Sequence, residues 1–203
     1  MEENKKDKMY FGDNVKLSLG TAIDKNYPIL LVGETGVGKT SFVRDIALER
    51  GKRLIRLNLT GQTGVDEILG KYLVRSTVDS RGNKTPEMYW VDGLLVTAMK
   101  EGHWIVFDEI NMCAAEILSV LHSLLDDDRS IVLKEKDGSL LKPHPAFRFF
   151  ATMNPEEEYA GTKELNKAFL SRFPIVLDVK YSENEVDIIN DRNKKRKKHK
   201  RNF

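Results

Sequence analysis

The segment from Gly33 to Thr40, which directly follows the apolar run 28–32, most constrains what this chain can fold into. Its glycines allow the backbone to form a concave nest whose N–H groups point at phosphate oxygens. Lys39 supplies a positive charge for the β- and γ-phosphates, and the hydroxyl of Thr40 is a ligand for Mg²⁺. The sequence therefore predicts a phosphate-binding loop made of Gly33, Glu34, Thr35, Gly36, Val37, Gly38, Lys39, Thr40 and Ser41.

The flanking residues give this motif the context that it requires. A match to the motif arises by chance in roughly one chain in a hundred of this length, so the neighbouring structure has to decide. An apolar strand precedes the loop, and Phe42, Val43, Ile46 and Ala47 follow it at the spacing of an amphipathic helix. A helix that begins here turns its unpaired N–H groups and its dipole toward a bound anion. The pattern predicts nucleotide binding.

Composition favours one globular domain, alone or with a short appendage, in a reducing compartment. The chain has 203 residues, of which 40% are hydrophobic and 32% are charged. Cys113 has no second cysteine with which to form an intrachain disulfide. Residues 1–8 lack the apolar core of a signal peptide, and no apolar run approaches the roughly 20 residues of a membrane span. We expect a cytoplasmic protein that does not associate with a membrane.

Charge is distributed unevenly along the chain. The residues after Asn190 carry eight basic side chains and one acidic one, whereas residues 1–190 carry 25 basic and 30 acidic side chains. Such a tail is typical of a nucleic-acid contact, of a nuclear targeting signal in a eukaryote, or of a solvated disordered segment. The sequence leaves these three interpretations open.

Alternating apolar runs and helical patterns predict an α/β fold. Helical patterns begin at Asp13, follow the phosphate-binding loop and occupy residues 117–125. This alternation is typical of a parallel sheet with helices on both faces, which binds ligands at the carboxyl ends of its strands. The predicted five-stranded sheet has the architecture of P-loop NTPases, and its strands are residues 29–32, 54–59, 105–107, 148–152 and 175–179.

Two segments interrupt the alternation. Residues 72–90 are strand-like on both sides of the turn-rich stretch 79–84, and residues 130–144 repeat this pattern around Asp137 and Gly138. Either segment could be an ordinary surface loop. Loops of this length without structure of their own are uncommon unless they are functional, so we predict two inserted β-hairpins with a function.

Asp108 and Glu109 follow a buried apolar strand, where acidic side chains are costly unless a cation or a proton donor needs them. Asp108 is the candidate to hold Mg²⁺, and Glu109 the candidate to orient and deprotonate an attacking water. The alternative is that both acids cap the helix that follows. Together with the upstream loop, the pair favours the catalytic interpretation.

Two further residues are candidates for the site. Asn154 ends the next strand, where its amide could hold the γ-phosphate or the attacking water, although Asn before Pro155 is also an ordinary turn residue. Arg172 follows a short helix and could complete a phosphoryl-transfer site. It could equally serve as a cation at the carboxyl end of that helix.

The ordered set of these segments resembles the AAA+ ATPases, and within them the dynein-related branch of MoxR-, CbbQ/NorQ- and midasin-type proteins. The resemblance runs from about residue 9 to residue 181. It identifies Lys39 and Thr40 as Walker A, Asp108 and Glu109 as Walker B, Asn154 as sensor 1, and Arg172 as an arginine finger that enters the neighbouring subunit's site. The family uses ATP with Mg²⁺, although a related restriction-enzyme branch uses GTP.

The resemblance also implies an assembly. Members usually form hexameric rings, often beside a partner with a von Willebrand A domain, and their hairpins project toward a central pore where they act on a protein client. After residue 181 the family continues into a helical lid with a further arginine. We expect residues 1–181 to form the nucleotide-binding core, and residues 182–203 the start of a helix and a polybasic tail without a full lid.

Three functions remain open at this point. The first is Mg²⁺-dependent ATP hydrolysis that drives the remodelling of a protein client by an oligomeric ring. The second is a nucleotide-binding assembly or regulatory module that hydrolyses little by itself, because the lid is absent. The third is a nucleic-acid-associated ATPase that uses the basic tail.

Overall fold

The computed structural model describes residues 13–78, 80, 82–155 and 165–179. The polybasic tail and the helix start predicted at residue 182 lie outside the described residues. Within the described part, the helices and strands alternate as the sequence predicts, and two hairpins are inserted between them.

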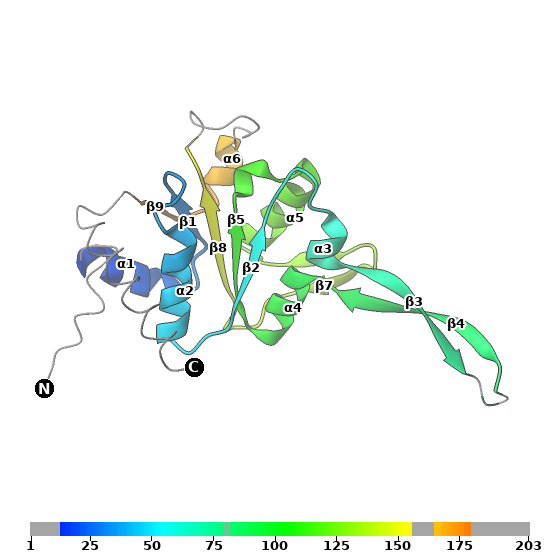
Figure 1. The fold of residues 1–203 in the computed structure, drawn as a ribbon. Helices are drawn as coiled ribbons and strands as arrows, with labels where there is room; N and C mark the ends of the chain where they lie inside the picture. The colour runs from blue at the N-terminus through cyan, green and yellow to red at the C-terminus, as the bar shows by residue number, and fades with distance from the viewer. Residues whose placement is uncertain (1–12, 79, 81, 156–164, 180–203) are drawn as a thin grey trace, which may run out of the picture.

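The centre of the molecule is a five-stranded parallel sheet (Figure 1). Its spatial order is β2-β5-β8-β1-β9, and every neighbouring pair runs parallel. The three inner strands are almost entirely buried because both faces of the sheet are covered there. The predicted fold class is confirmed, with strands β1 (Ile29–Val32), β2 (Leu54–Asn58), β5 (Trp104–Asp108), β8 (Arg148–Met153) and β9 (Ile175–Asp178).

Alternate residues of the inner strands contribute to two separate cores. In β5, Trp104 and Val106 belong to one cluster, whereas Ile105 and Phe107 belong to the other. The first cluster lies under α1 (Asp13–Asp24) and α2 (Lys39–Glu49). The second and larger cluster lies under the remaining helices, which are α3 (Val65–Leu69), α4 (Leu94–Glu101), α5 (Ala115–Leu125) and α6 (Lys167–Leu170), together with the 3₁₀ turn η1 (Ile110–Met112).

Both predicted hairpins are present. Strands β3 (Gly70–Val78) and β4 (Lys84–Asp92) pair in antiparallel register along their whole length and project away from the body of the molecule (Figure 1). Strands β6 (Ile131–Leu133) and β7 (Ser139–Leu141) form the shorter hairpin. Its turn contains Gly138 at φ 70°, a left-handed conformation that glycine adopts without strain.

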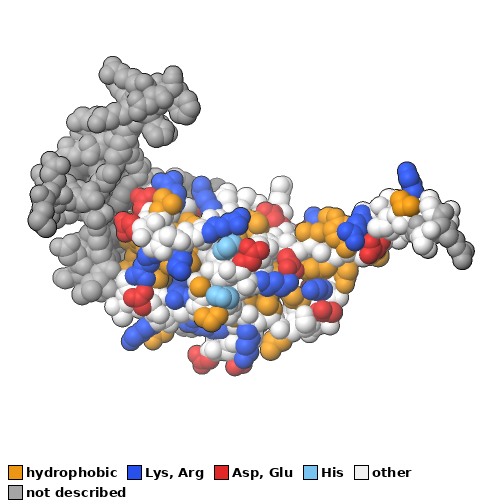
Figure 2. All heavy atoms as spheres, turned by 90° about the horizontal axis from the view of Figure 1, so that it is seen from below, with side chains coloured by type: hydrophobic (Ala, Val, Ile, Leu, Met, Phe, Trp, Pro, Cys, Tyr) orange, Lys and Arg blue, Asp and Glu red, His pale blue; other side chains and the backbone are white. Residues whose placement is uncertain are grey.

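The base of the long hairpin is fixed to the body, while the rest of it is exposed. Tyr72 packs edge-on against Trp90 with ring centroids 5.2 Å apart, and its hydroxyl donates to the carbonyl of Lys136 at 3.0 Å. The long hairpin thereby contacts the segment between β6 and β7. Figure 2 shows hydrophobic side chains along the projecting arm. The exposed large hydrophobic residues of its described part are Tyr72, Leu73, Val74, Val78, Met88 and Val91.

Among the described residues, no helix combines the length and the apolar character that crossing a membrane requires.

The larger core should dominate the stability of the fold. Leu121 of α5 is fully buried in it, whereas Leu48 of α2 is 68% exposed. We expect Leu121→Ala to lower the free energy of unfolding by about 3–5 kcal/mol, because it removes buried methyl groups and leaves a cavity. The matched control, Leu48→Ala, should change this free energy by less than about 0.5 kcal/mol. Urea unfolding of both variants measures the difference, and equal effects would contradict this account of the core.

Candidate nucleotide-binding site

The predicted phosphate-binding loop connects the carboxyl end of β1 to the first residue of α2. Gly38 caps α2 at φ 94°, and Gly36 lies at φ 88°, so both need the left-handed conformation that glycine allows. Gly33 is required for another reason. A Cβ atom there would lie 2.2 Å from the carbonyl oxygen of Val179, where the backbone after β9 passes the loop. Packing against β9 therefore fixes the start of the loop.

Lys39 lies inside this loop and is only 8% exposed. Its ammonium group donates to the carbonyl oxygens of Gly33 at 2.6 Å and Glu34 at 2.9 Å, and to Oδ1 of Asn154 at 2.9 Å. Burial lowers the pKa of Lys39, and the negative charges of Asp108 and Glu109 partly offset this effect. The amine is thus a buried cation at the centre of the loop, joined to the end of β8.

Asp108 ends the central strand β5 and is 2% exposed. Its Oδ1 accepts hydrogen bonds from the hydroxyls of Thr40 at 2.7 Å and Thr152 at 3.0 Å. Its Oδ2 pairs with the guanidinium of Arg56 on β2. One carboxylate therefore contacts α2, β8 and β2. The structure brings together Lys39, Thr40, Asp108 and Asn154 as the sequence predicted.

These residues fit a Mg²⁺ ion that is bound together with nucleotide. Within the described ranges, no group of three or more His, Cys, Asp or Glu side chains could hold a metal. Mg²⁺ does not need one, because it keeps several waters and binds through one or two carboxylates and the substrate phosphates. The hydroxyl of Thr40 and the carboxylate of Asp108, 2.7 Å apart, are oxygen ligands of the kind it prefers. When bound, the ion would neutralise charge on the phosphates.

Glu109 adopts an unusual backbone conformation beside Asp108. It lies at φ 59° and ψ 49°, in the left-handed region, and its N–H donates to the hydroxyl of Thr152 at 3.3 Å. Its side chain makes no capping hydrogen bond to η1, so the helix-capping alternative has no support at this residue. Non-glycine residues held in this region cluster at functional sites.

Arg172 lies near the amino ends of β9 and β1, whereas the phosphate-binding loop follows the carboxyl end of β1. It precedes β9 by three residues and lines a surface hollow with Tyr27 and Pro28, which lead into β1. Its Nε donates to Asp126 at 2.5 Å, and its Nη1 donates to the carbonyl of Ala168. The second contact is the one that a cation at the end of α6 would make. The structure does not bring Arg172 to the phosphate-binding loop of its own chain.

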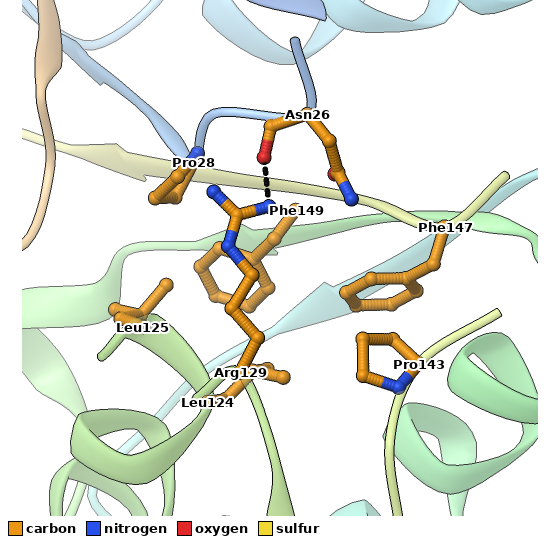
Figure 3. Close-up of a pocket in the computed structure, with 8 residues that line it drawn as sticks. All are labelled: Asn26, Pro28, Leu124, Leu125, Arg129, Pro143, Phe147 and Phe149. Atoms are coloured by element: carbon orange, nitrogen blue, oxygen red, sulfur yellow. Dashed lines mark hydrogen bonds between the residues drawn. The ribbon is translucent and has the colours of Figure 1, made fainter. Parts of the chain in front are cut away.

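A small cavity near the amino ends of the strands has a structural role (Figure 3). Arg129 crosses it and donates to the backbone carbonyl of Asn26, while Phe147 and Phe149 line its apolar wall. Burial lowers the pKa of Arg129. The contact connects the chain after α5 to the turn before β1, and none of the residues predicted to bind phosphate lines this cavity.

Three residues of the site were missed by sequence reasoning. Thr152 and Arg56 both bind Asp108, and the side-chain amide of Asn111 donates to the carbonyl of Asn154 at 3.4 Å. Oδ1 of Asn111 is buried and has no hydrogen-bond partner among the described residues. A signal existed for Arg56, because it is a basic residue inside an apolar strand, two positions before the strand ends.

The comparison with protein families agrees with this geometry. The model of the AAA domain of the dynein-related subfamily matches residues 28–173. The chain belongs to this subfamily. The match covers the phosphate-binding loop, the strand that ends in Asp108, and both hairpins of the AAA domain.

Relatives of this AAA domain are found in large and in shorter proteins. The domain is 40% identical over 151 residues to midasin of Dictyostelium discoideum, and 39% identical over 159 residues to midasin of Giardia intestinalis. These alignments cover 74% and 78% of the chain but 2% and 3% of the midasins. An uncharacterised protein of Staphylococcus aureus is 33% identical over 163 residues, which is 80% of the chain and 59% of that protein. The chain thus spans only part of these relatives.

A solved structure shares the fold. The crystal structure of a candidate ATPase from Cytophaga hutchinsonii superposes with a TM-score of 0.64 at 21% sequence identity. The alignment covers 89% of this chain and 49% of that protein. The arrangement of the AAA domain, with its parallel sheet and helices, therefore recurs in a protein of low sequence identity.

The buried amine of Lys39 predicts a proton linkage. Its pKa is lowered from 10.5 in the empty site, and bound phosphates should raise it again because they stabilise the charged form. At about pH 9 the phosphates of ATP are already ionised. We therefore expect ATP binding to be accompanied by proton uptake at the amine of Lys39. Calorimetry in two buffers of different ionisation enthalpy measures this uptake. Proton release instead of uptake would contradict the assignment.

Proposed function

We propose that this AAA domain binds ATP with Mg²⁺ and hydrolyses it as a subunit of a ring that acts on a protein client. One observation carries the proposal. Four predicted side chains from separate parts of the chain meet at the carboxyl ends of the strands. Lys39 donates a hydrogen bond to Asn154, and Thr40 donates one to Asp108. Family membership supports the same activity.

Each side chain has a separate role in the proposed reaction. The loop N–H groups and Lys39 bind and orient the phosphates, and Asn154, already 2.9 Å from the amine of Lys39, would hold the γ-phosphate or the attacking water. Glu109 is half-buried beside Asp108 and would accept the proton of that water. Mg²⁺ would neutralise the charge that develops on the phosphates.

A ring is proposed because Arg172 lies far from the loop of its own chain. An arginine that stabilises the transferred phosphoryl group raises the rate of transfer roughly 10³–10⁵-fold, whether it comes from the same chain or from a neighbour. Arg172 is held by Asp126 at the amino edge of the sheet, so a neighbouring subunit would have to receive it. We propose a homo-oligomer, with a hexamer as the expected size and a von Willebrand A-domain protein as a candidate partner.

The β3–β4 hairpin is the proposed contact for the client. It projects from the body and exposes a series of large hydrophobic side chains, and its base contacts the shorter hairpin. Exposed apolar groups on a projecting arm are typical of a protein contact.

Turnover should depend on assembly. We expect phosphate release per subunit to rise with protein concentration, because each site needs an arginine from a neighbour. Glu109→Gln should lower this rate by roughly 10²–10⁴-fold while it leaves ATP binding intact. A coupled phosphate assay and a nucleotide-binding titration measure the two effects. Tight ATP binding without turnover at any concentration would instead favour a nucleotide-binding assembly or regulatory module.

The arginine supplied in trans has its own test. Arg172→Ala subunits mixed with an equal amount of wild-type protein should reduce total turnover to less than the wild-type subunits contribute alone, because they inactivate neighbouring sites. The matched control is Lys167→Ala, which removes an exposed cation from α6, the short helix that precedes Arg172. Turnover that falls only in proportion to the wild-type fraction would exclude a role in trans.

A further inference from the structure

Among the described residues that hydrogen-bond to Asp108, Arg56 is the charged partner, and the proposed reaction does not use it. It lies on β2, at the edge of the sheet, and its guanidinium Nε pairs with Oδ2 of Asp108. The two partners differ strongly in exposure: the side chain of Arg56 is 62% exposed, whereas that of Asp108 is 3% exposed. A long cationic side chain at the surface thus reaches a buried carboxylate.

The need for this cation follows from the other contacts of Asp108. Thr40 and Thr152 donate to Oδ1, but both are neutral hydroxyls. The ammonium group of Lys39 donates instead to two backbone carbonyls and to Asn154. Leaving a buried carboxylate without a charged partner is costly. Until a metal binds, Arg56 would provide the countercharge in direct contact with Asp108, whereas Lys39 acts on it only through space.

Mg²⁺ and Arg56 would compete for the same carboxylate. A divalent ion bound beside Thr40 needs the negative charge of Asp108, and the nearby positive charge of Arg56 opposes its binding. The arginine can leave, because most of its side chain is in water and it is not part of either apolar core. Displacing Arg56 breaks this ion pair. The presence of Arg56 therefore raises the concentration of Mg²⁺ that the site requires.

We propose that Arg56 is a displaceable counterion that stabilises Asp108 in the empty site and sets the Mg²⁺ concentration at which nucleotide binds. This inference rests on the proposed function, because it concerns the same site. Arg56 is a positioning residue that acts through Asp108, and it takes no part in proton transfer.

The test is the Mg²⁺ dependence of nucleotide binding by the full chain, measured with a fluorescent ATP analogue over a range of Mg²⁺ concentrations. Arg56→Met should lower the half-saturating Mg²⁺ concentration roughly three- to tenfold, the range expected for a pair with one exposed partner. Arg56→Lys keeps the charge and should stay close to the wild type. The matched control is Arg44→Met, since Arg44 is similarly exposed on α2 and pairs only with Asp45 among the described residues.

A second measurement separates this role from a general effect on folding. In EDTA without nucleotide, Arg56→Met should melt at a lower temperature than Arg44→Met, because Asp108 loses its countercharge. Saturating Mg²⁺ and nucleotide should then raise its melting temperature by more than they raise that of the wild type. An unchanged or higher half-saturating Mg²⁺ concentration in Arg56→Met would overturn the inference while leaving nucleotide binding in place. If the wild type binds no nucleotide at any Mg²⁺ concentration, the proposed function fails as well.

Discussion

The carboxylate of Asp108 lies at the end of the central strand, almost completely out of water, and accepts hydrogen bonds from three other elements of the chain. Thr40 brings the first turn of α2 to it, Thr152 brings β8, and Arg56 brings β2. A buried charge of this kind is unfavourable unless all of its partners are in place. Asp108 therefore couples the first turn of α2, and with it the phosphate-binding loop, to three strands of the sheet.

A second set of contacts connects the loop to β8. Lys39 spans from the backbone of the loop to Asn154, and Asn111 donates to the carbonyl of the same residue. Because the two networks share the end of β8, a change in the occupancy of the loop would alter the environment of both Asp108 and Asn154. Glu109 has a left-handed backbone conformation, and its N–H donates a hydrogen bond to the hydroxyl of Thr152.

Sequence patterns predicted most of this arrangement because they report on short-range physics. The apolar runs predicted the strands, and the glycine spacing predicted the loop. The turn signals at Asp137 and Gly138 predicted the shorter hairpin. The pairing of Arg56 with Asp108 was not predictable, since it depends on β2 lying beside β5, a choice that no local pattern specifies. The contact of Arg172 with Asp126 was not predictable for a similar reason, because the two residues are 46 positions apart along the chain.

The central claim is that Asp108 holds Mg²⁺ for a nucleotide bound at Lys39. Titration calorimetry of ATP binding, with and without Mg²⁺, tests it in the wild type and in Asp108→Asn, which keeps the size of the side chain but removes its charge. We predict that Mg²⁺ strengthens ATP binding in the wild type and has little effect in Asp108→Asn. An equal effect of Mg²⁺ on both proteins would contradict the account.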